Sequence, residues 1–251
     1  MPHLQQYHFV VRIFQCRHPT NYKNKRMNFL KKIFGQNNKA DDNQQINNDF
    51  EVITDPERNK KFQEDLHKIQ SGEIEKVFPI IKPGNWVGIK AGALRQTLIG
   101  EKENPKLVVG FGYYAPNNFV FLNHSDYQDR EKLESMVEKA YRNLHDHEVT
   151  LNVVVPNKVI IIDGQDFCSE KILDTTFMKA LQDKMGGDNL VVSIPRRRCM
   201  MVTNSFEEEG ICNQFLSVHN KTWNDESYGN AQIINSLFVV KNGEIETVKD
   251  L

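Results

Sequence analysis

The spacing of apolar residues predicts that hairpins alternate with helices along most of the chain. Pairs of β-rich runs joined by short turns recur four times, and an apolar stripe of helical period follows each of the first three pairs. The pairs span about 106–122, 149–162, 189–203 and 236–248. The last pair turns at Asn242-Gly243, which is the strongest short hairpin signal in the chain.

This order of elements favours an α+β fold, in which successive hairpins build an antiparallel sheet and the following helices pack against one face. The helices are predicted at about 133–144, 171–185 and 206–218. The alternative is a doubly wound α/β fold, but that fold would place single strands between the helices.

A further helix and an extended segment precede the first hairpin. Thr54 or Asp55 caps this helix, Pro56 takes its first turn and Gly72 ends it. Residues 77–89 are apolar with repeated Pro and Gly, which indicates extended segments.

Composition and charge separate a basic leader from an acidic domain. The 251 residues are 39% hydrophobic and 26% charged, which is typical of a folded soluble protein. The net charge of -1 hides an asymmetry, because residues 1–40 hold eight Lys or Arg and no acid, which leaves 24 basic and 33 acidic residues for the other 211. An acidic domain disfavours nucleic acid as a partner.

The domain boundary is predicted where the low-complexity sequence stops. Residues 1–48 form a flexible basic leader with an Asn/Gln-rich linker, and residues 49–251 form a single α+β domain, with a subdivision near residue 105 as the alternative.

Met27 is the predicted natural start of the protein, with residues 1–26 lying upstream of it. The motivation is that residues 27–35 look like a complete short amphipathic helix. We expect this helix to dock on the domain or lie at its surface, the alternative being weak contact with a membrane surface. No apolar run approaches the ~20 residues of a membrane span, so stable membrane insertion is not expected.

Cysteine and histidine spacing predicts neither a metal nor a cofactor. Four scattered cysteines match no zinc framework and are typical of a reducing cytoplasm, where we place the protein. His145 and His147 stand at a helix end, where a metal is the less favoured interpretation because no third ligand can be named. Gly110-Phe-Gly112 lacks the third glycine of a nucleotide loop, so its glycines are predicted to allow close strand packing.

The most unusual surface feature is the arginine run at a hairpin tip, Arg196, Arg197 and Arg198. Three guanidiniums in an acidic domain make a local site for a phosphate or for a partner's carboxylates. The alternative is a solvated turn, or arginines paired with acidic residues such as Glu207–Glu209. The run leads us to expect a non-enzymatic binding module for a protein or a small anionic partner.

The rival hypothesis is a hydrolase or transferase that uses a carboxylate and a histidine. Its candidate residues are Asp163 and Asp166 with His124 or His219. This hypothesis requires a pocket in which at least two of these side chains converge.

Several segments resemble the YtpQ-like family of bacterial proteins. The helix 133–144, with its Ala-x-x-Asn-Leu pattern, is similar to a helix of that family, and 187–197 is similar to its strand ending in Ile-Pro-x-Arg. The segments starting at Val77 and Ser236 also match. The resemblance implies an α+β domain over about residues 55–248 and carries no catalytic motif. The family commonly has Asp where this chain has Arg198, so the resemblance also implies a more basic site here.

Overall fold

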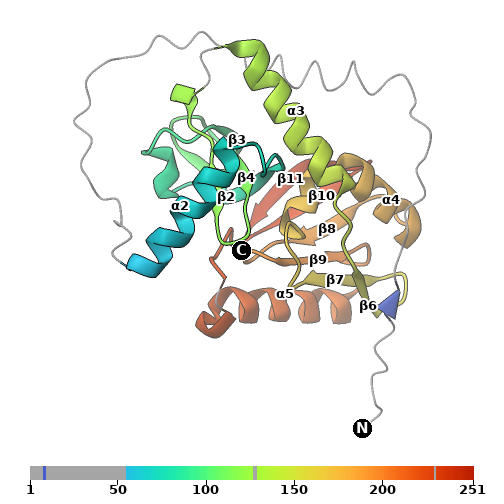
Figure 1. Ribbon diagram of the computed structural model, residues 1–251. Helices are drawn as coiled ribbons and strands as arrows, with labels where there is room; N and C mark the ends of the chain where they lie inside the picture. The colour runs from blue at the N-terminus through green and yellow to red at the C-terminus, as the bar shows by residue number, and fades with distance from the viewer. Residues whose placement is uncertain (1–7, 10–54, 127–128, 229) are drawn as a thin grey trace.

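The computed structural model describes residues 8–9, 55–126, 129–228 and 230–251 (Figure 1). The predictions for the helix at 27–35, for the linker that follows it and for Met27 as the start lie outside these residues. From the leader, the structure describes only the strand β1 (His8–Phe9), which pairs with β6.

The hairpins are divided between two antiparallel sheets, where the sequence predicted one. The smaller sheet has the order β2-β4-β3, with β5 also paired to β4. The larger sheet has the order β1-β6-β7-β9-β8-β10-β11. The strands of the smaller sheet are β2 (Val77–Pro83), β3 (Arg95–Gly100), β4 (Pro105–Tyr114) and β5 (Phe119–Phe121). Those of the larger sheet are β6 (Leu151–Val155), β7 (Val159–Asp163), β8 (Leu190–Ser193), β9 (Cys199–Thr203), β10 (Ser236–Lys241) and β11 (Glu244–Asp250).

The α+β fold and all four predicted hairpins are confirmed. Each predicted pair of runs forms an antiparallel strand pair at its expected place. Asn242 and Gly243 both adopt positive φ, 52° and 82°, as the predicted tight turn between β10 and β11 requires.

Helices cover both faces of the larger sheet, whereas the sequence predicted one face. Helix α4 (Thr175–Met185) contributes Met178 to a core that includes Met200, and α5 (Glu209–Asn224) contributes Phe215 to a second core that includes Met201. Successive strand residues point to opposite faces, so the unbroken apolar run of β9 serves a helix on each side.

The smaller sheet is covered by α3 (Arg130–Asp146), which runs alongside it in Figure 1. Its stripe of Leu133, Val137 and Ala140 packs with Val109 and Phe111, as the helical period predicted. Helix α2 (Pro56–Gln70) begins at the predicted Asp55 cap, whose carboxylate accepts from the Glu57 N–H at 3.0 Å.

The helix predicted from residue 206 begins at Glu209, so Phe206 lies outside it. Two other boundaries differ from the prediction for a local reason. The helix predicted at 171–185 is a 3₁₀ turn (Ser169–Leu173) followed by α4, because the Asp174 side chain caps the Phe177 N–H and restarts the helix. Helix α5 continues to Asn224, past the predicted end at 218, because a polar residue, His219, is buried against the sheet.

The two sheets share one apolar core. Ile81 and Leu107 of the smaller sheet are fully buried in the cluster that holds Ile160, Val192 and Phe238 of the larger sheet. This shared cluster brings β2 close to the β8–β9 hairpin. In the described ranges, no helix combines the length and apolar character needed to cross a membrane.

Candidate functional site

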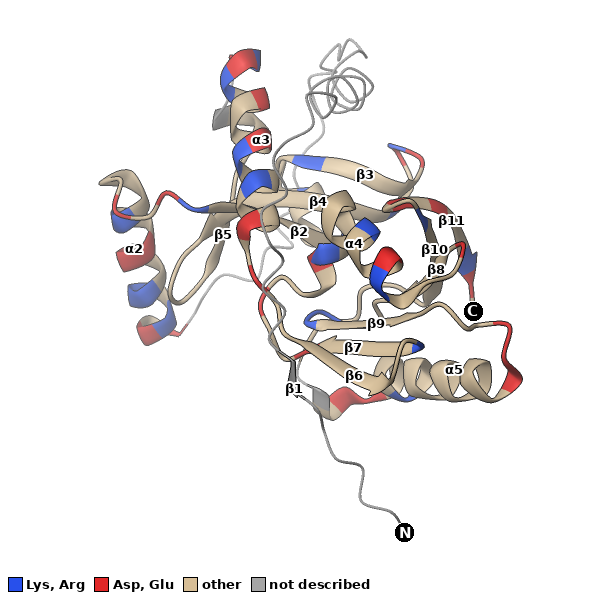
Figure 2. Cartoon of the chain, turned by 90° about the vertical axis from the view of Figure 1, so that its right-hand side faces the viewer, with Lys and Arg blue, Asp and Glu red and all other residues tan. Residues whose placement is uncertain are grey.

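The arginine run before β9 separates into three different environments. Figure 2 shows it as a basic stretch at the start of that strand. The expectation that all three guanidiniums lie at the surface is wrong for Arg196, which is buried. Its guanidinium donates to the carbonyls of Thr222, Trp223 and Asn230 at 2.6, 2.7 and 2.8 Å. Arg196 therefore ties the C-terminal end of α5 to the segment that carries Asn230, and its guanidinium is committed to this structural role.

Arg198 is half-buried and forms an ion pair with Asp166. Asp166 also accepts from the Tyr114 hydroxyl at 2.5 Å. Burial acts to raise the pKa of Asp166, but the Tyr114 hydrogen bond and the Arg198 charge outweigh it and lower that pKa. Arg198 thus pairs with Asp166, and not with the Glu207–Glu209 segment that the sequence suggested; Glu208 pairs with Lys158 instead.

Backbone strain accompanies this ion pair. Arg198 has φ of 61° and Phe167, next to Asp166, has φ of 57°. Phe167 is buried and stacks on Phe78 with ring centroids 4.1 Å apart. A bulky residue in the left-handed region costs about 1–3 kcal/mol, and such strain tends to gather at functional sites.

Arg197 is the arginine of the run whose guanidinium makes no hydrogen bond or ion pair with any residue that the structure describes. It is half-buried, and only its backbone N–H is bonded, to the Ala231 carbonyl at 2.9 Å. The second cation beside it is Lys82 of β2, which also has no carboxylate at ion-pair distance within the described ranges. Burial and the Arg197 charge lower the pKa of Lys82 to about 8.

A buried carboxyl group, Glu170, lies near both cations. Glu170 is 1% exposed, and its Oε1 accepts from the Ile81 N–H at 3.1 Å. Burial raises its pKa, against the opposing effect of Arg197 and Lys82. Two cations thus share one buried acid that is itself harder to ionise, which leaves the surroundings net positive.

Two aromatic rings complete this group of residues. The Lys82 Nζ lies 5.7 Å from the Trp86 ring centroid and 5.4 Å from that of Phe121. The two rings are 4.4 Å apart, and both side chains are half-buried. We call Lys82, Arg197, Glu170, Trp86 and Phe121 the Lys82–Arg197 cluster.

Glycines provide the space for these rings, as predicted for the Gly110-Phe-Gly112 segment. A Cβ at Gly110 would meet the Phe121 ring at 3.1 Å and the Trp86 ring at 3.3 Å, and one at Gly112 would meet the Phe119 ring at 2.4 Å. A Cβ at Gly88 would lie 2.1 Å from the Trp86 ring. The expectation of close strand packing is therefore confirmed.

Replacing Gly88 with alanine is expected to displace the Trp86 ring, since that contact leaves no room for a methyl group. In a Trp223→Phe background, the fluorescence of Trp86 should shift to the red, and the free energy of unfolding should fall by about 1–3 kcal/mol. Gly210 in α5 has open space around it, so Gly210→Ala is the control and should raise stability slightly. An unchanged Trp86 emission in Gly88→Ala would contradict the packing.

The carboxylate and histidine candidates of the enzyme hypothesis do not converge. Asp163 is exposed and accepts from Asn152 Nδ2 at 3.1 Å, and His124 is exposed in a 3₁₀ turn after β5. His219 is fully buried between Ser193 Oγ at 2.7 Å and Asn235 Oδ1 at 2.9 Å. Among the described contacts, none joins these residues to one another or to Asp166.

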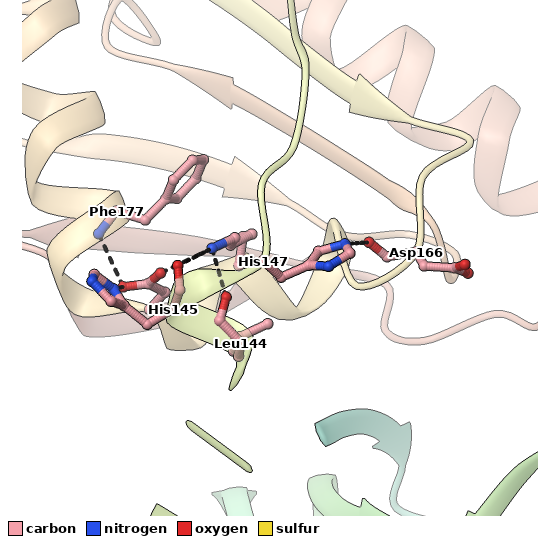
Figure 3. Close-up of polar contacts among 7 residues, drawn as sticks. Leu144, His145, His147, Asp166 and Phe177 are labelled. Atoms are coloured by element: carbon pink, nitrogen blue, oxygen red, sulfur yellow. Dashed lines mark hydrogen bonds and ion pairs between the residues drawn. The ribbon is translucent and has the colours of Figure 1, made fainter. Parts of the chain in front are cut away.

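His145 and His147 point away from each other (Figure 3). His145 Nδ1 lies 3.2 Å from Asp174 Oδ1, while His147 Nε2 lies 3.0 Å from the Asp166 carbonyl oxygen, to which it donates. Across the described ranges, no group of three or more His, Cys, Asp or Glu side chains is placed to hold a metal ion.

A buried ion pair between Lys171 and Asp174 joins two helix ends, next to Leu144, His145 and Phe177 in Figure 3. Lys171 Nζ donates to the carbonyls of Leu144 and His145 at 2.7 and 3.2 Å and to Asp174 Oδ2 at 3.0 Å. Both side chains are 3% exposed. Lys171 caps the end of α3 and Asp174 caps the start of α4, so this pair is a structural junction.

Comparison with known proteins adds no relative: no family model matches the chain, and neither the curated proteins nor the solved structures give a match. The resemblance to the YtpQ-like family therefore stays a prediction.

Proposed function

We propose that this chain is a binding module for a small ligand that carries a carboxylate or phosphate group, recognised by Arg197 and Lys82. The observation that carries the proposal is that two half-buried cations, of which Arg197 is near enough to lower the pKa of Lys82, have no ion-pair partner among the described residues. Burial lowers the pKa of Lys82 most, and the Arg197 charge lowers it further. An oxyanion placed between them relieves the repulsion between their charges and receives charge-assisted hydrogen bonds.

The aromatic rings indicate what the anionic group is attached to. Trp86 and Phe121 line one side of the cluster and are only half-buried, so they offer apolar surface beside the cations. Ligand sites typically combine such surface with a few placed polar groups. An oxyanion bonded to an aromatic or other apolar group therefore matches the cluster better than a bare inorganic ion.

Calorimetric titration of the full chain with phenyl phosphate, inorganic phosphate and phenol tests this function. We expect phenyl phosphate to bind most tightly, because it meets both the cations and the rings. Arg197→Ala and Lys82→Met should each weaken its binding by about tenfold or more, the amount expected for a hydrogen bond to a charged group.

The matched control is Arg142→Ala, which removes an exposed arginine on α3. This variant should bind phenyl phosphate as the unaltered chain does. Absence of binding by all three probes, or equal affinity in Arg197→Ala, would remove the cluster from the function. A carboxylate or phosphate on a partner protein offers the same chemistry, and phenyl phosphate would then compete with that partner.

We further propose a cytoplasmic setting. The cysteines Cys168, Cys199 and Cys212 are free thiols, which supports a reducing environment.

A further inference from the structure

We infer that a cavity between the two sheets binds a free amino acid with a large apolar side chain, whose carboxylate pairs with Lys106 and whose ammonium pairs with Asp250. The inference goes beyond the proposed anion site, because it concerns a second place on the molecule. Among the described residues, those that line this cavity include no member of the Lys82–Arg197 cluster.

The cavity has a volume of about 420 Å³, within the range of about 300–1,000 Å³ that is typical of small-molecule sites. It lies where the smaller sheet meets the larger one. The end of β2 and the start of β4 form one side, and the last turn of α5, residues 233–236 and the end of β11 form the other. A single amino acid, even one with an aromatic side chain, fits within this volume.

One part of the lining is apolar and consists of Pro83, Pro105, Trp223, Ile233 and Ile234. Trp223 is half-buried, so it keeps surface to offer a ligand. Its carbonyl accepts from Arg196 Nη2 at 2.7 Å and from Gln232 Nε2 at 2.8 Å, which fixes the backbone that carries the ring. An apolar side chain placed here is removed from water, which favours binding.

The wall from the smaller sheet is closely packed. The Gly84 N–H donates to the Lys106 carbonyl at 2.9 Å, which joins the end of β2 to the start of β4. A Cβ at Gly84 would lie 1.7 Å from the Pro105 carbonyl oxygen, so the two backbones approach too closely for any other residue. Both sides of the cavity are therefore held in place before a ligand arrives.

The polar part of the lining carries one positive and one negative charge side by side. Lys106 Nζ lies 2.6 Å from Asp250 Oδ2, and the buried Ser236 hydroxyl donates to Asp250 Oδ1 at 2.9 Å. The hydrogen bonds from Lys106 and Ser236 lower the pKa of Asp250, so this carboxylate stays ionised at neutral pH. Both charged side chains are more than half exposed, so a ligand in the cavity can reach them.

This pair of charges matches an amino acid better than a simple anion or cation. An ammonium has three donors and a carboxylate about four acceptor positions, so each group can keep its partner and also bind a ligand. An anion would meet the attraction of Lys106 together with the repulsion of Asp250, and a cation would meet the reverse. A zwitterion with both charges on one carbon finds an opposite charge for each, which leaves its side chain for the apolar wall.

Calorimetric titration of the full chain with L-phenylalanine tests the inference. Hydrocinnamate lacks the ammonium, phenethylamine lacks the carboxylate and glycine lacks the side chain, so each should bind about tenfold or more weakly than L-phenylalanine. Lys106→Met and Asp250→Asn should each weaken the binding of L-phenylalanine by a similar factor. In Asp250→Asn, L-phenylalanine and hydrocinnamate should then bind alike, because the partner of the ammonium is gone. In Lys106→Met, L-phenylalanine and phenethylamine should bind alike.

The matched control is Lys158→Met, which breaks another exposed ion pair, with Glu208 at 2.7 Å, outside the cavity. This variant should bind L-phenylalanine as the unaltered chain does. In a Trp86→Phe background, Trp223 is the only tryptophan, and its emission should shift to the blue when L-phenylalanine binds. Circular dichroism shows whether each variant is folded, and if one of Lys106→Met and Asp250→Asn is not, the other decides.

Three results would each overturn the inference. They are no heat of binding with L-phenylalanine, equal affinity for hydrocinnamate in the unaltered chain, and unchanged binding of L-phenylalanine in the folded variants at positions 106 and 250. Binding of N-acetyl-L-phenylalanine amide as tight as that of L-phenylalanine would show that the cavity takes a side chain of a peptide, and would also contradict the free amino acid.

Discussion

Arg196→Ala is expected to lower the free energy of unfolding by about 3–5 kcal/mol. The substitution leaves three carbonyls without their charged donor, two in the last turn of α5 and the third at Asn230 beyond it, in a place where the Arg196 side chain is buried. Each hydrogen bond to a charged group contributes about 1.5–3 kcal/mol, and the three do not add fully. Urea unfolding followed by far-ultraviolet circular dichroism measures the loss.

The neighbouring arginine supplies the control for this result. Arg197→Ala removes the same side chain one residue later and should change stability by less than about 1 kcal/mol, since no described hydrogen bond is lost. The free energy of unfolding of Arg196→Lys should lie between those of the two alanine variants. An ammonium lacks the planar set of donors with which the guanidinium reaches three carbonyls. Equal stability of Arg196→Ala and Arg197→Ala would show that Arg196 does not hold α5.

Asp174→Asn is expected to cost a similar amount, about 3–5 kcal/mol, for a different reason. Asparagine keeps an oxygen that can cap the Phe177 N–H, but it leaves the Lys171 ammonium buried without a counter-ion. The double variant Lys171→Met with Asp174→Asn should recover part of the loss, because no uncompensated charge remains. Thermal unfolding of the single and double variants checks this.

The control is Lys179→Ala in α4, which breaks an exposed ion pair with Asp183 and should cost less than about 0.5 kcal/mol.

The pH dependence of stability distinguishes the buried pair from the exposed one. Burial acts to raise the pKa of Asp174, but His145, Lys171 and the Phe177 N–H outweigh it and lower that pKa. A lowered pKa means that the stabilisation is present above the unfolded value of about 3.9 and is lost as pH falls through the folded value. The difference between the unaltered chain and Asp174→Asn should therefore shrink below about pH 4, and a constant difference would contradict the assignment.

Much of the fold could be predicted because hairpin and helix periods differ so clearly in this chain. The four strand pairs, the stripe of α3 and the Asp55 cap all follow from local patterns. The missed strand β3 (Arg95–Gly100) is short, with its polar residues first and its apolar residues after them, so it shows no alternation. The division into two sheets could not be predicted either, because strand pairing between distant segments leaves no local signal.

The candidate site could be predicted only in part. The run at 196–198 stood out by its charge, yet one arginine holds a helix, one pairs with Asp166, and only Arg197 is left for a ligand. Which of the three is free depends on carbonyls and carboxylates far away in sequence. Lys82 was missed because it is a single charged residue in an apolar run, and Glu170 was missed because it stands beside Lys171 in a mixed segment with no pattern of its own. The one signal that could have found Lys82 is its place in a buried strand, where a lysine needs a reason.

The shared core of the two sheets has a consequence for the proposed binding of an anionic ligand. Lys82 belongs to the smaller sheet, whereas Arg197 stands beside β9 of the larger one, and the Glu170–Ile81 hydrogen bond joins the two regions. The separation of the two cations is therefore fixed by how the sheets dock. By thermodynamic linkage, a ligand that bridges Lys82 and Arg197 also stabilises the docking of the two sheets. A change that destabilises the docking lowers the affinity for that ligand by the same free energy.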